Sequence, residues 1–424
     1  MIKEDFLHHL WKYKLFSSSK LQTIQQETIV IVNSGMHNHN TGPDFFNARL
    51  KINNQLWAGN VEIHIKSSDW YVHGHENDPN YDSVVLHVVY EHDVEIHRKY
   101  NTVIPTLELK KYIDKEVLNN YKQLFASNQK WVNCEKDIVN IDKFIMSNWL
   151  ERLYIERLEQ KSELINNLLI ESKNDWEAVL FKLLAKNFGL KVNGDAFFSL
   201  ACQLDFSILR KEQHNLFSLE ALLFGQANLL VESIEDSHYL KLQKEYEYLK
   251  TKYKLPISFG TPFQFFRLRP NNFPTIRLAQ FSALYHQQQN LFSKLIEITE
   301  ITDYYKLFEF SMTDYWKTHY SFTSISKKSE KKLTKSFIDL LLINTFIPLK
   351  FMYLKSIGKL NETEVLELIK QLKSEKNTIM DKFHKLNILS NNALESQALL
   401  QLKNNYCLEQ KCLQCAIGNT LLQN

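Results

Sequence analysis

Acidic and histidine side chains gather in one short stretch of the chain, TGPDFFNARLKINNQLWAGNVEIHIKSSDWYVHGH. Asp44 lies where a strand is expected to begin. Glu62 and His64 are two positions apart in the next expected strand, so their side chains leave the same face. A hairpin can bring Asp44 beside Glu62. Paired carboxylates at a strand edge suit a hard divalent cation, Mg²⁺ or Mn²⁺, which would polarise a phosphoryl oxygen and activate water.

Further polar residues of this stretch extend the hypothesis. His64 could ligate a metal or act as a base near neutral pH, and Lys66, on the same face, could supply positive charge. His73 and His75 are side chains that zinc accepts, and Gly74 between them would let the backbone approach closely. If the segment is extended, both imidazoles lie on one side.

The same pattern also suits a solvent-exposed strand without chemistry, since such strands alternate apolar and polar residues. Asp69 and Asn40, close to the other candidates in the sequence, favour the functional interpretation. His87 lies inside an apolar strand pattern, so we expect it to be a hydrogen-bonded core residue and not a ligand.

Cysteines form a second candidate site. The C-terminal YCLEQKCLQCAIG holds Cys407, Cys412 and Cys415, and Cys134 is a candidate fourth ligand. Three thiols within nine residues favour a structural metal, either zinc held by four thiolates or an iron–sulfur cluster. The alternative is a set of incidental thiols. Cys202, in an apolar helical pattern, is expected to be buried.

Alternating patterns predict strands in the first quarter of the chain. ETIVIVNSG, FFNARLKI, VEIHIK and SVVLHVVYEH read as strands, the last apolar enough to be central. In FFNARLKI the expected inward residues are Phe46, Ala48, Leu50 and Ile52. An amphipathic helix is expected over 3–16, ahead of the strands.

From about residue 113 the apolar period becomes helical. DWEAVLFKLLAKNFG is a clear example, with Asn174 or Asp175 as its cap and Gly189 as its stop. Further helices are expected over 149–161, 216–230, 239–253, 278–298, 337–349 and 362–372. We therefore predict an α+β protein: a mixed α/β sheet unit over 1–115, followed by a large all-α domain over 116–424 that carries the cysteine cluster.

Composition sets broad limits on this fold. With 424 residues, 44% of them hydrophobic, the chain has enough material for two packed domains. The N-terminus, MIKEDFLHHLWKYKLF, does not read as a signal peptide, and no uninterrupted run of about 18 apolar residues is present. We expect a cytoplasmic protein without a membrane partner. A formal net charge of +3 permits a nucleic-acid partner without favouring one, and leaves the oligomeric state open.

The N-terminal part resembles the PD-(D/E)xK nuclease superfamily, the restriction-endonuclease-like fold. That family has a first helix, a strand bearing Pro-Asp, a strand bearing Glu-x-Lys, a helix and a further apolar strand. Here Pro43-Asp44 and Glu62-Ile63 match, while His64 stands where lysine is usual. Some of these nucleases carry an iron–sulfur staple with one upstream cysteine and three near the C-terminal end. Here Cys134 follows the sheet residues instead of preceding them, so this match is partial.

The whole chain resembles a bacterial family of unknown function, the domain-of-unknown-function family 2851. The segments that carry the resemblance are NHNTGPDFFNARL, NVEIHIKSSDWYVHGH, LEALLFGQANLL, FRLRPNNFPTIRLAQ, SQALLQL and YCLEQKCLQCAIG. This resemblance implies no activity.

The residues and the nuclease resemblance together support one hypothesis, a metal-dependent phosphodiesterase acting on DNA or RNA. Asp44 and Glu62 would hold Mg²⁺ or Mn²⁺, and His64 or Lys66 would orient the water. One alternative is a non-enzymatic scaffold or nucleic-acid-binding protein with a degenerate site. Another is a hydrolase of a different substrate that uses His73 and His75.

Overall fold

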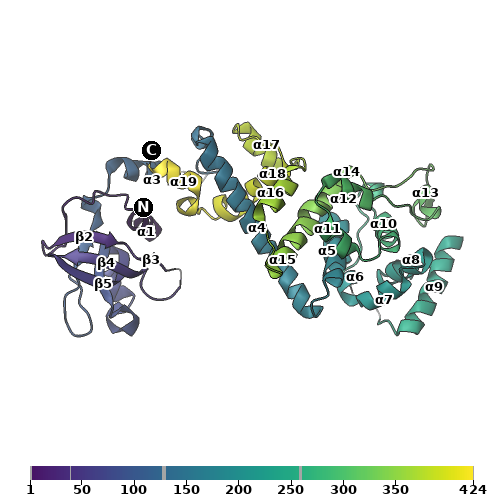
Figure 1. The fold of residues 1–424 in the computed structure, drawn as a ribbon, viewed down its shortest axis with the longest axis horizontal. Helices are drawn as coiled ribbons and strands as arrows, with labels where there is room; N and C mark the ends of the chain where they lie inside the picture. The colour runs from purple at the N-terminus through teal and green to yellow at the C-terminus, as the bar shows by residue number, and fades with distance from the viewer. Residues whose placement is uncertain (1, 39, 127–129, 257–259, 424) are drawn as a thin grey trace. The chain divides into compact units, whose positions relative to one another are not determined.

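The structure is a computed structural model that describes residues 2–38, 40–126, 130–256 and 260–423 (Figure 1). It divides into two compact units. The first comprises Met1–Trp149, Lys385–Ile388 and Leu402–Asn424, and the second Leu150–His384 and Leu389–Gln401. The predicted boundary after residue 115 does not coincide with this division, because α3 and the end of the chain pack together in the first unit. The predicted α+β class is confirmed.

The first unit is built on a mixed sheet, with the strand order β1-β2-β4-β5-β6-β7 and β3 paired to β4. Helix α1, which the apolar spacing predicts, packs against β5. The elements of this unit, before the chain enters the second, are α1 (Glu4–Tyr13), β1 (Leu21–Gln22), β2 (Thr28–Asn33), β3 (Met36–His37), β4 (Phe45–Ile52), β5 (Gln55–Lys66), α2 (Asp69–Val72), β6 (Val84–Glu91), β7 (Thr106–Glu108) and α3 (Lys115–Phe125).

Strand β4 contains a bulge that changes which residues face the core. Asn47 has a φ of 56°, and the pairing of β4 with β5 shifts register between Phe45 and Ala48. Phe45 and Ala48 are both fully buried, whereas Phe46 is only partly so. The expectation that Phe46 faces inward was wrong because a bulge adds one residue to the alternation.

Strands β5 and β6 are parallel, and Glu62 pairs with His87 in their register. The predicted central strand is confirmed: β6 pairs with β5 on one side and β7 on the other, and it is buried from Val84 to Val89. Parallel neighbours need a crossover connection. Here that connection consists of α2 and two short 3₁₀ helices, η1 (His75–Asn77) and η2 (Pro79–Tyr81).

The C-terminal segment returns to this first unit. It comprises η7 (Leu402–Cys407), a π-helical turn, then η8 (Cys412–Gln414) and α19 (Ala416–Gln423). Helix α19 packs beside α3, and η8 contacts α1 (Figure 1).

The second unit is helical apart from a two-stranded sheet. The predicted cap is confirmed in α5, where Asp175 Oδ1 accepts a hydrogen bond from the Ala178 N–H at 3.1 Å. The single helix expected over 278–298 is two helices, because Asn290 adopts a φ of 51° between them. The elements are α4 (Lys143–Glu171), which crosses from the first unit, α5 (Trp176–Phe188), α6 (Leu190–Gln203), α7 (Phe206–Glu212), α8 (Leu216–Gln226), α9 (Ser237–Tyr253), α10 (Pro274–Gln287), α11 (Leu291–Glu297), α12 (Ile301–Leu307), α13 (Tyr315–Thr318), β8 (His319–Ser321), β9 (Ser324–Ile325), α14 (Lys335–Leu341), α15 (Ile347–Ser356), α16 (Glu362–Lys370), α17 (Thr378–Lys385) and α18 (Ala393–Gln401).

One helical run in the described residues, Lys335–Ser356, is long and apolar enough to cross a membrane by length and composition, with a mean hydropathy of 1.6. Core helices of soluble proteins have the same properties, and 61% of this apolar window is buried inside the protein. Localisation in the cytoplasm stays a prediction.

Candidate metal and carboxylate site

Asp44 and Glu62 lie side by side at the edge where β4 begins. The Asp44 N–H donates to Glu62 Oε2 at 3.1 Å, and the Ile63 N–H donates to Asp44 Oδ2 at 2.9 Å. Each carboxylate is therefore held by the backbone of the neighbouring strand. Glu62 is only 4% exposed. The two carboxylates lie next to each other in the structure, as the hairpin pattern predicted.

Two histidines lie against the other oxygen of Glu62, and a third lies against one of them. His75 Nε2 lies 3.3 Å and His64 Nε2 lies 3.5 Å from Glu62 Oε1, and His73 Nδ1 lies 3.1 Å from His64 Nε2. One ring nitrogen from each of His64, His73 and His75 falls within 4.8 Å of the others. His75 Nε2 is buried and makes no hydrogen bond within the described part of the chain. Such a group of nitrogens beside a carboxylate oxygen could hold one transition-metal ion.

The rings of this group are oriented by their neighbours. His64 Nδ1 lies 2.8 Å from His87 Nε2, and His87 is fully buried, as expected of a hydrogen-bonded core residue. His75 stacks on Tyr81 at 3.7 Å between ring centroids and meets the Trp70 ring edge-on. A histidine that binds a metal through one nitrogen is usually held in place through the other, and His87 holds His64 in this way.

The turn that carries His73 and His75 differs from the expectation. The segment is not extended: His73 ends α2 and His75 begins η1, with Gly74 between them at a φ of 71°. A Cβ on Gly74 would meet no atom within 4 Å, so its role is the left-handed backbone and not a close approach.

Two residues of α1 join the site and were missed by sequence reasoning. His8 Nε2 lies 3.2 Å from Asp44 Oδ2, and Glu4 is close enough to Asp44 and Glu62 for their charges to act on it. Glu4 and His8 are four positions apart, so they share a helix face. That polar spacing, next to the apolar stripe that predicted α1, was the available signal.

Burial and mutual repulsion shift the protonation of these groups. Burial, with the charge of Asp44, raises the pKa of Glu62 to about 9, and burial with the same charge raises the pKa of Glu4 to about 7. Burial lowers the pKa of His64 to about 3, and also lowers the pKa of His75, so both imidazoles are neutral. Neutral imidazoles are the form that binds metals, and a cation would relieve the repulsion between the carboxylates.

Other predicted residues lie outside this cluster. Lys66 is exposed at the end of β5, and its backbone N–H donates to Asp69 Oδ2 at 2.9 Å. Asp69 therefore forms a local turn. The Asn40 N–H donates to Asn38 Oδ1 at 2.9 Å, which places Asn40 in a turn before β4.

The four candidate cysteines come together in the first unit. Cys134, Cys407, Cys412 and Cys415 line one cavity of about 20 Å³. Burial, with the neighbouring sulfurs, raises the pKa of Cys134 to about 12, and burial raises the pKa of Cys415 to about 11. Cys202 is exposed on α6. The expectation that it is buried was wrong because its position falls on the outer face of the helix.

Residues 4–378 match the model of a family described as protein of unknown function, DUF2851. The chain belongs to the DUF2851 family. No curated protein and no solved structure matches the chain. The matched range contains the whole carboxylate and histidine cluster and Cys134. It ends before SQALLQL and YCLEQKCLQCAIG, so three of the four clustered cysteines lie beyond it.

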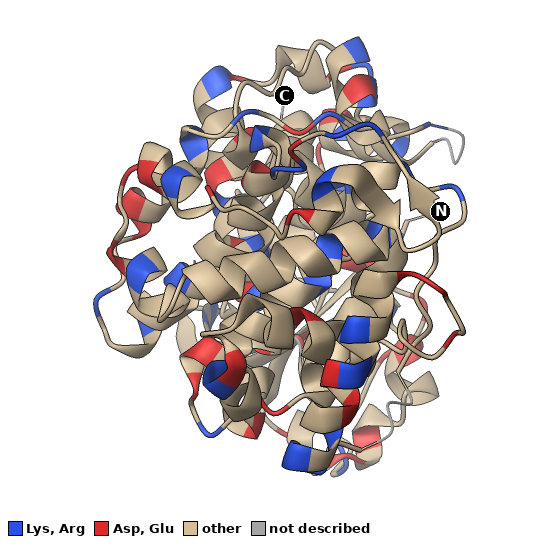
Figure 2. Cartoon of the chain, turned by 90° about the vertical axis from the view of Figure 1, so that its right-hand side faces the viewer, with Lys and Arg blue, Asp and Glu red and all other residues tan. Residues whose placement is uncertain are grey.

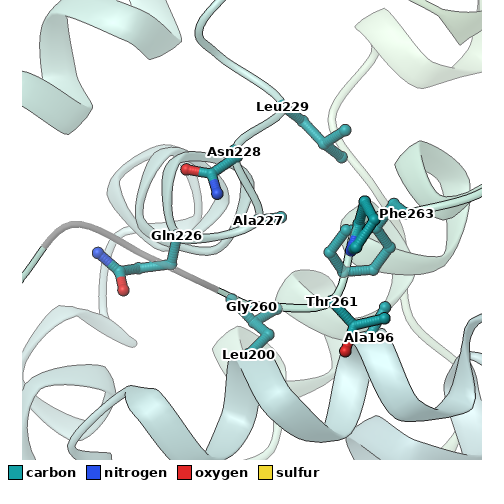
Figure 3. A pocket seen from close by; sticks show the side chains of 10 residues that line it. Ala196, Leu200, Gln226, Ala227, Asn228, Leu229, Gly260, Thr261 and Phe263 are labelled. Carbon is teal, nitrogen blue, oxygen red and sulfur yellow. The ribbon is translucent and has the colours of Figure 1, made fainter.

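The second unit of this DUF2851 member contains a cavity of about 210 Å³ between α6, the end of α8 and the segment 260–263 (Figure 3). Its lining comprises Ala196, Leu200, Gln226, Ala227, Asn228, Leu229, Gly260, Thr261, Pro262 and Phe263. Apart from the amides of Gln226 and Asn228 and the hydroxyl of Thr261, these side chains are apolar and none is acidic or basic. Among the described residues, the lining of this cavity therefore offers no general acid or base.

Charged residues of both signs are interspersed on the helices that face the viewer in Figure 2.

Of the arginines in the segment FRLRPNNFPTIRLAQ, Arg277 has a structural role. Arg277 is 7% exposed, donates to Gln280 Oε1 at 2.9 Å and to Asn272 Oδ1 at 2.7 Å, and lies over the Phe337 ring. Its guanidinium is therefore committed inside the protein.

Proposed function

We propose that the first unit is a metal-dependent phosphodiesterase acting on nucleic acid. The observation that carries this proposal is that Asp44 and Glu62 converge, with His64 and His75 against one oxygen of Glu62 and His73 grouped with them. A divalent ion held there would polarise a phosphoryl oxygen and lower the pKa of a bound water.

The ligand set favours a particular class of ion. Glu62 is shared between Asp44 on one side and His64 and His75 on the other. Imidazole nitrogens suit Mn²⁺ and Zn²⁺, whereas Mg²⁺ prefers oxygen ligands. We therefore expect Mn²⁺ or Zn²⁺ to support activity better than Mg²⁺.

Glu4 is the residue best suited to take the proton of the attacking water. Its pKa of about 7, raised by burial and by Asp44, matches that of a general base at neutral pH. The water oxygen attacks phosphorus and its proton passes to Glu4. The bond from phosphorus to the sugar oxygen then breaks, and that oxygen is protonated from solvent. His64 is better suited to ligation, because His87 holds its Nδ1 while its Nε2 lies toward Glu62 and His73.

The order of elements also supports the proposal. A helix, a strand preceded by Pro-Asp, a strand with Glu-x-His, a short helical crossover and a parallel apolar strand follow one another as in the PD-(D/E)xK resemblance. In this chain His64 takes the place of the usual lysine, and Lys66 lies at the exposed end of the strand.

The test is cleavage of plasmid DNA, single-stranded DNA and RNA by the full chain with Mg²⁺, Mn²⁺ or Zn²⁺. We expect cleavage with Mn²⁺ or Zn²⁺, and its loss in Glu62→Gln and His75→Ala. Glu95→Gln, an exposed glutamate of the same unit whose carboxylate bonds Gln25 and not the cluster, is the matched control and should cleave normally.

Two outcomes would overturn the proposal. One is the absence of cleavage of every substrate with every ion, which favours a non-catalytic binding protein. The other is cleavage that Glu62→Gln leaves unchanged, which assigns the activity to a contaminant or to another site.

A further inference from the structure

We propose that Cys134, Cys407, Cys412 and Cys415 form a thiolate metal centre that fastens the C-terminal segment to the first unit. The ligand chemistry is that of four sulfurs for a soft cation, either a zinc ion or an iron–sulfur cluster. This centre is separate from the carboxylate and histidine cluster and does not depend on the proposed phosphodiesterase activity.

The four cysteines reach one cavity from two segments that are far apart in the chain. Cys134 lies in a turn, where its carbonyl accepts the N–H groups of Asp137 and Ile138. The other three lie around η7, η8 and the start of α19. Asn133 Nδ2 donates to Cys412 Sγ at 3.5 Å across 279 positions of sequence. Incidental cysteines would not be expected to share one cavity across such a separation.

Hydrogen-bond donors point at the sulfurs. The backbone N–H groups of Ile417 and Gly418 bond the sulfur of Cys415, and Asn133 bonds that of Cys412. A neutral thiol is a weak acceptor, so donors arranged around sulfur suit thiolates. Such N–H groups are the outer-shell partners that orient metal-bound sulfur.

Gly418 shows how closely the two parts of the loop approach. A Cβ at this position would lie 2.0 Å from the carbonyl oxygen of Cys412. Only glycine lets the start of α19 fold back onto η8 at this distance. That close approach keeps Cys412 and Cys415 on the same cavity.

The size of the cavity bears on which metal is expected. A space of about 20 Å³ is small for a cluster of several iron and sulfur atoms, and a single ion is the smaller addition to it. Zinc is therefore the expected occupant. An iron–sulfur cluster would confirm the thiolate centre and correct its identity.

The experiment is elemental analysis of the full chain, purified without oxygen, with a visible absorption spectrum to detect the sulfur-to-iron charge-transfer bands of a cluster. About one zinc per chain bound at the cysteines is expected. Cys412→Ser should lose it and Cys202→Ser, the exposed fifth cysteine, should keep it. A His73→Ala/His75→Ala double variant should also keep it, which separates the two candidate sites.

Thiol accessibility tests the centre without any variant. In the native protein a thiol reagent should modify Cys202 at once and the clustered cysteines only as metal is released. Metal content unchanged in Cys412→Ser would overturn the proposal. So would rapid modification of every cysteine with no metal released, or a native chain that takes up neither zinc nor iron when both are supplied under reducing conditions.

Discussion

At the scale of single residues, Glu62 is the most informative side chain. Its position beside Asp44 follows from period-two alternation and a hairpin, so sequence predicted it. The burial of the Glu62 carboxyl, which raises its pKa, depends on α1 and on the crossover that carries His75. Helix α1 lies far from Glu62 along the chain, and the crossover turns back where the sequence suggested an extended segment, so no local pattern places either. Glu4 and His8 escaped prediction for the same reason.

The protonation of Glu62 gives a test of the metal-free protein. An unfolded chain releases this proton near the ordinary value of 4.5, and the folded chain only near 9. The folded state therefore loses stability as pH rises between those values, by up to about 1.4 kcal/mol per pH unit. Glu62→Gln should remove this dependence.

The measurement is denaturant unfolding of chelator-treated protein at pH 7, 8 and 9. Lys161, whose pKa burial lowers to about 7, is common to both proteins and cancels in their difference. Glu4 also has a pKa of about 7 and feels the charge of Glu62, so the comparison rests on pH 8 and 9, above the titration of Glu4. Parallel stability curves for the two proteins would contradict the buried proton on Glu62.

A second residue-scale prediction concerns Glu4. If it takes the water proton, Glu4→Gln should reduce cleavage on the order of 10²-fold while metal content stays the same. The acidic limb of the pH–rate profile should disappear, and we expect that limb below pH 7 because a bound cation offsets the charge of Asp44 that helps raise the pKa of Glu4. Lys12→Gln, at the other end of the same helix, controls for general effects on α1. A loss of bound metal in Glu4→Gln would make Glu4 a ligand instead.

At the scale of elements, α1 joins the two candidate sites. One face supplies Glu4 and His8 to the carboxylate cluster. His9 is buried, and it is hydrogen-bonded to the backbone of Leu413 in η8. The amphipathic pattern predicted the helix but not these partners, because a stripe of apolar residues does not identify what covers it.

Gly418 provides the test at this scale. Gly418→Ala should destabilise the first unit by about 1–3 kcal/mol, because the added methyl group overlaps the Cys412 carbonyl. Gly194→Ala, in helix α6, is the matched control, since its Cβ would meet its closest atom at 3.2 Å. Thermal unfolding and metal content report the effect. Equal stability of the two variants would contradict the tight turn at Gly418.

At the scale of the whole molecule, both candidate metal sites belong to the first unit, whereas the family match extends through most of the second. Composition, and the change from alternating to helical spacing of apolar residues, predicted a unit with a sheet followed by a helical one. The boundary was less accessible, because the C-terminal segment joins the sheet unit after the helical one. Sequence patterns group each residue with its neighbours along the chain, whereas this C-terminal segment packs in the first unit.

Metal removal should therefore act on one unit only. We expect chelation to speed hydrogen exchange in α1, the 73–83 crossover and 402–423, and to leave α5 and α10 unchanged. Hydrogen exchange followed by mass spectrometry measures this directly, with the metal-reloaded protein as control. Faster exchange in α5 or α10 would show that the units do not respond separately.

The contact between His9 and Leu413 has a consequence for the timing of biosynthesis. Ribosomes make α1 first and η8 some 400 positions later, as the sequence order requires. Until η8 emerges, the side of α1 that carries His9 lacks this partner. The buried environment of His9 is thereby completed only in the late stages of translation.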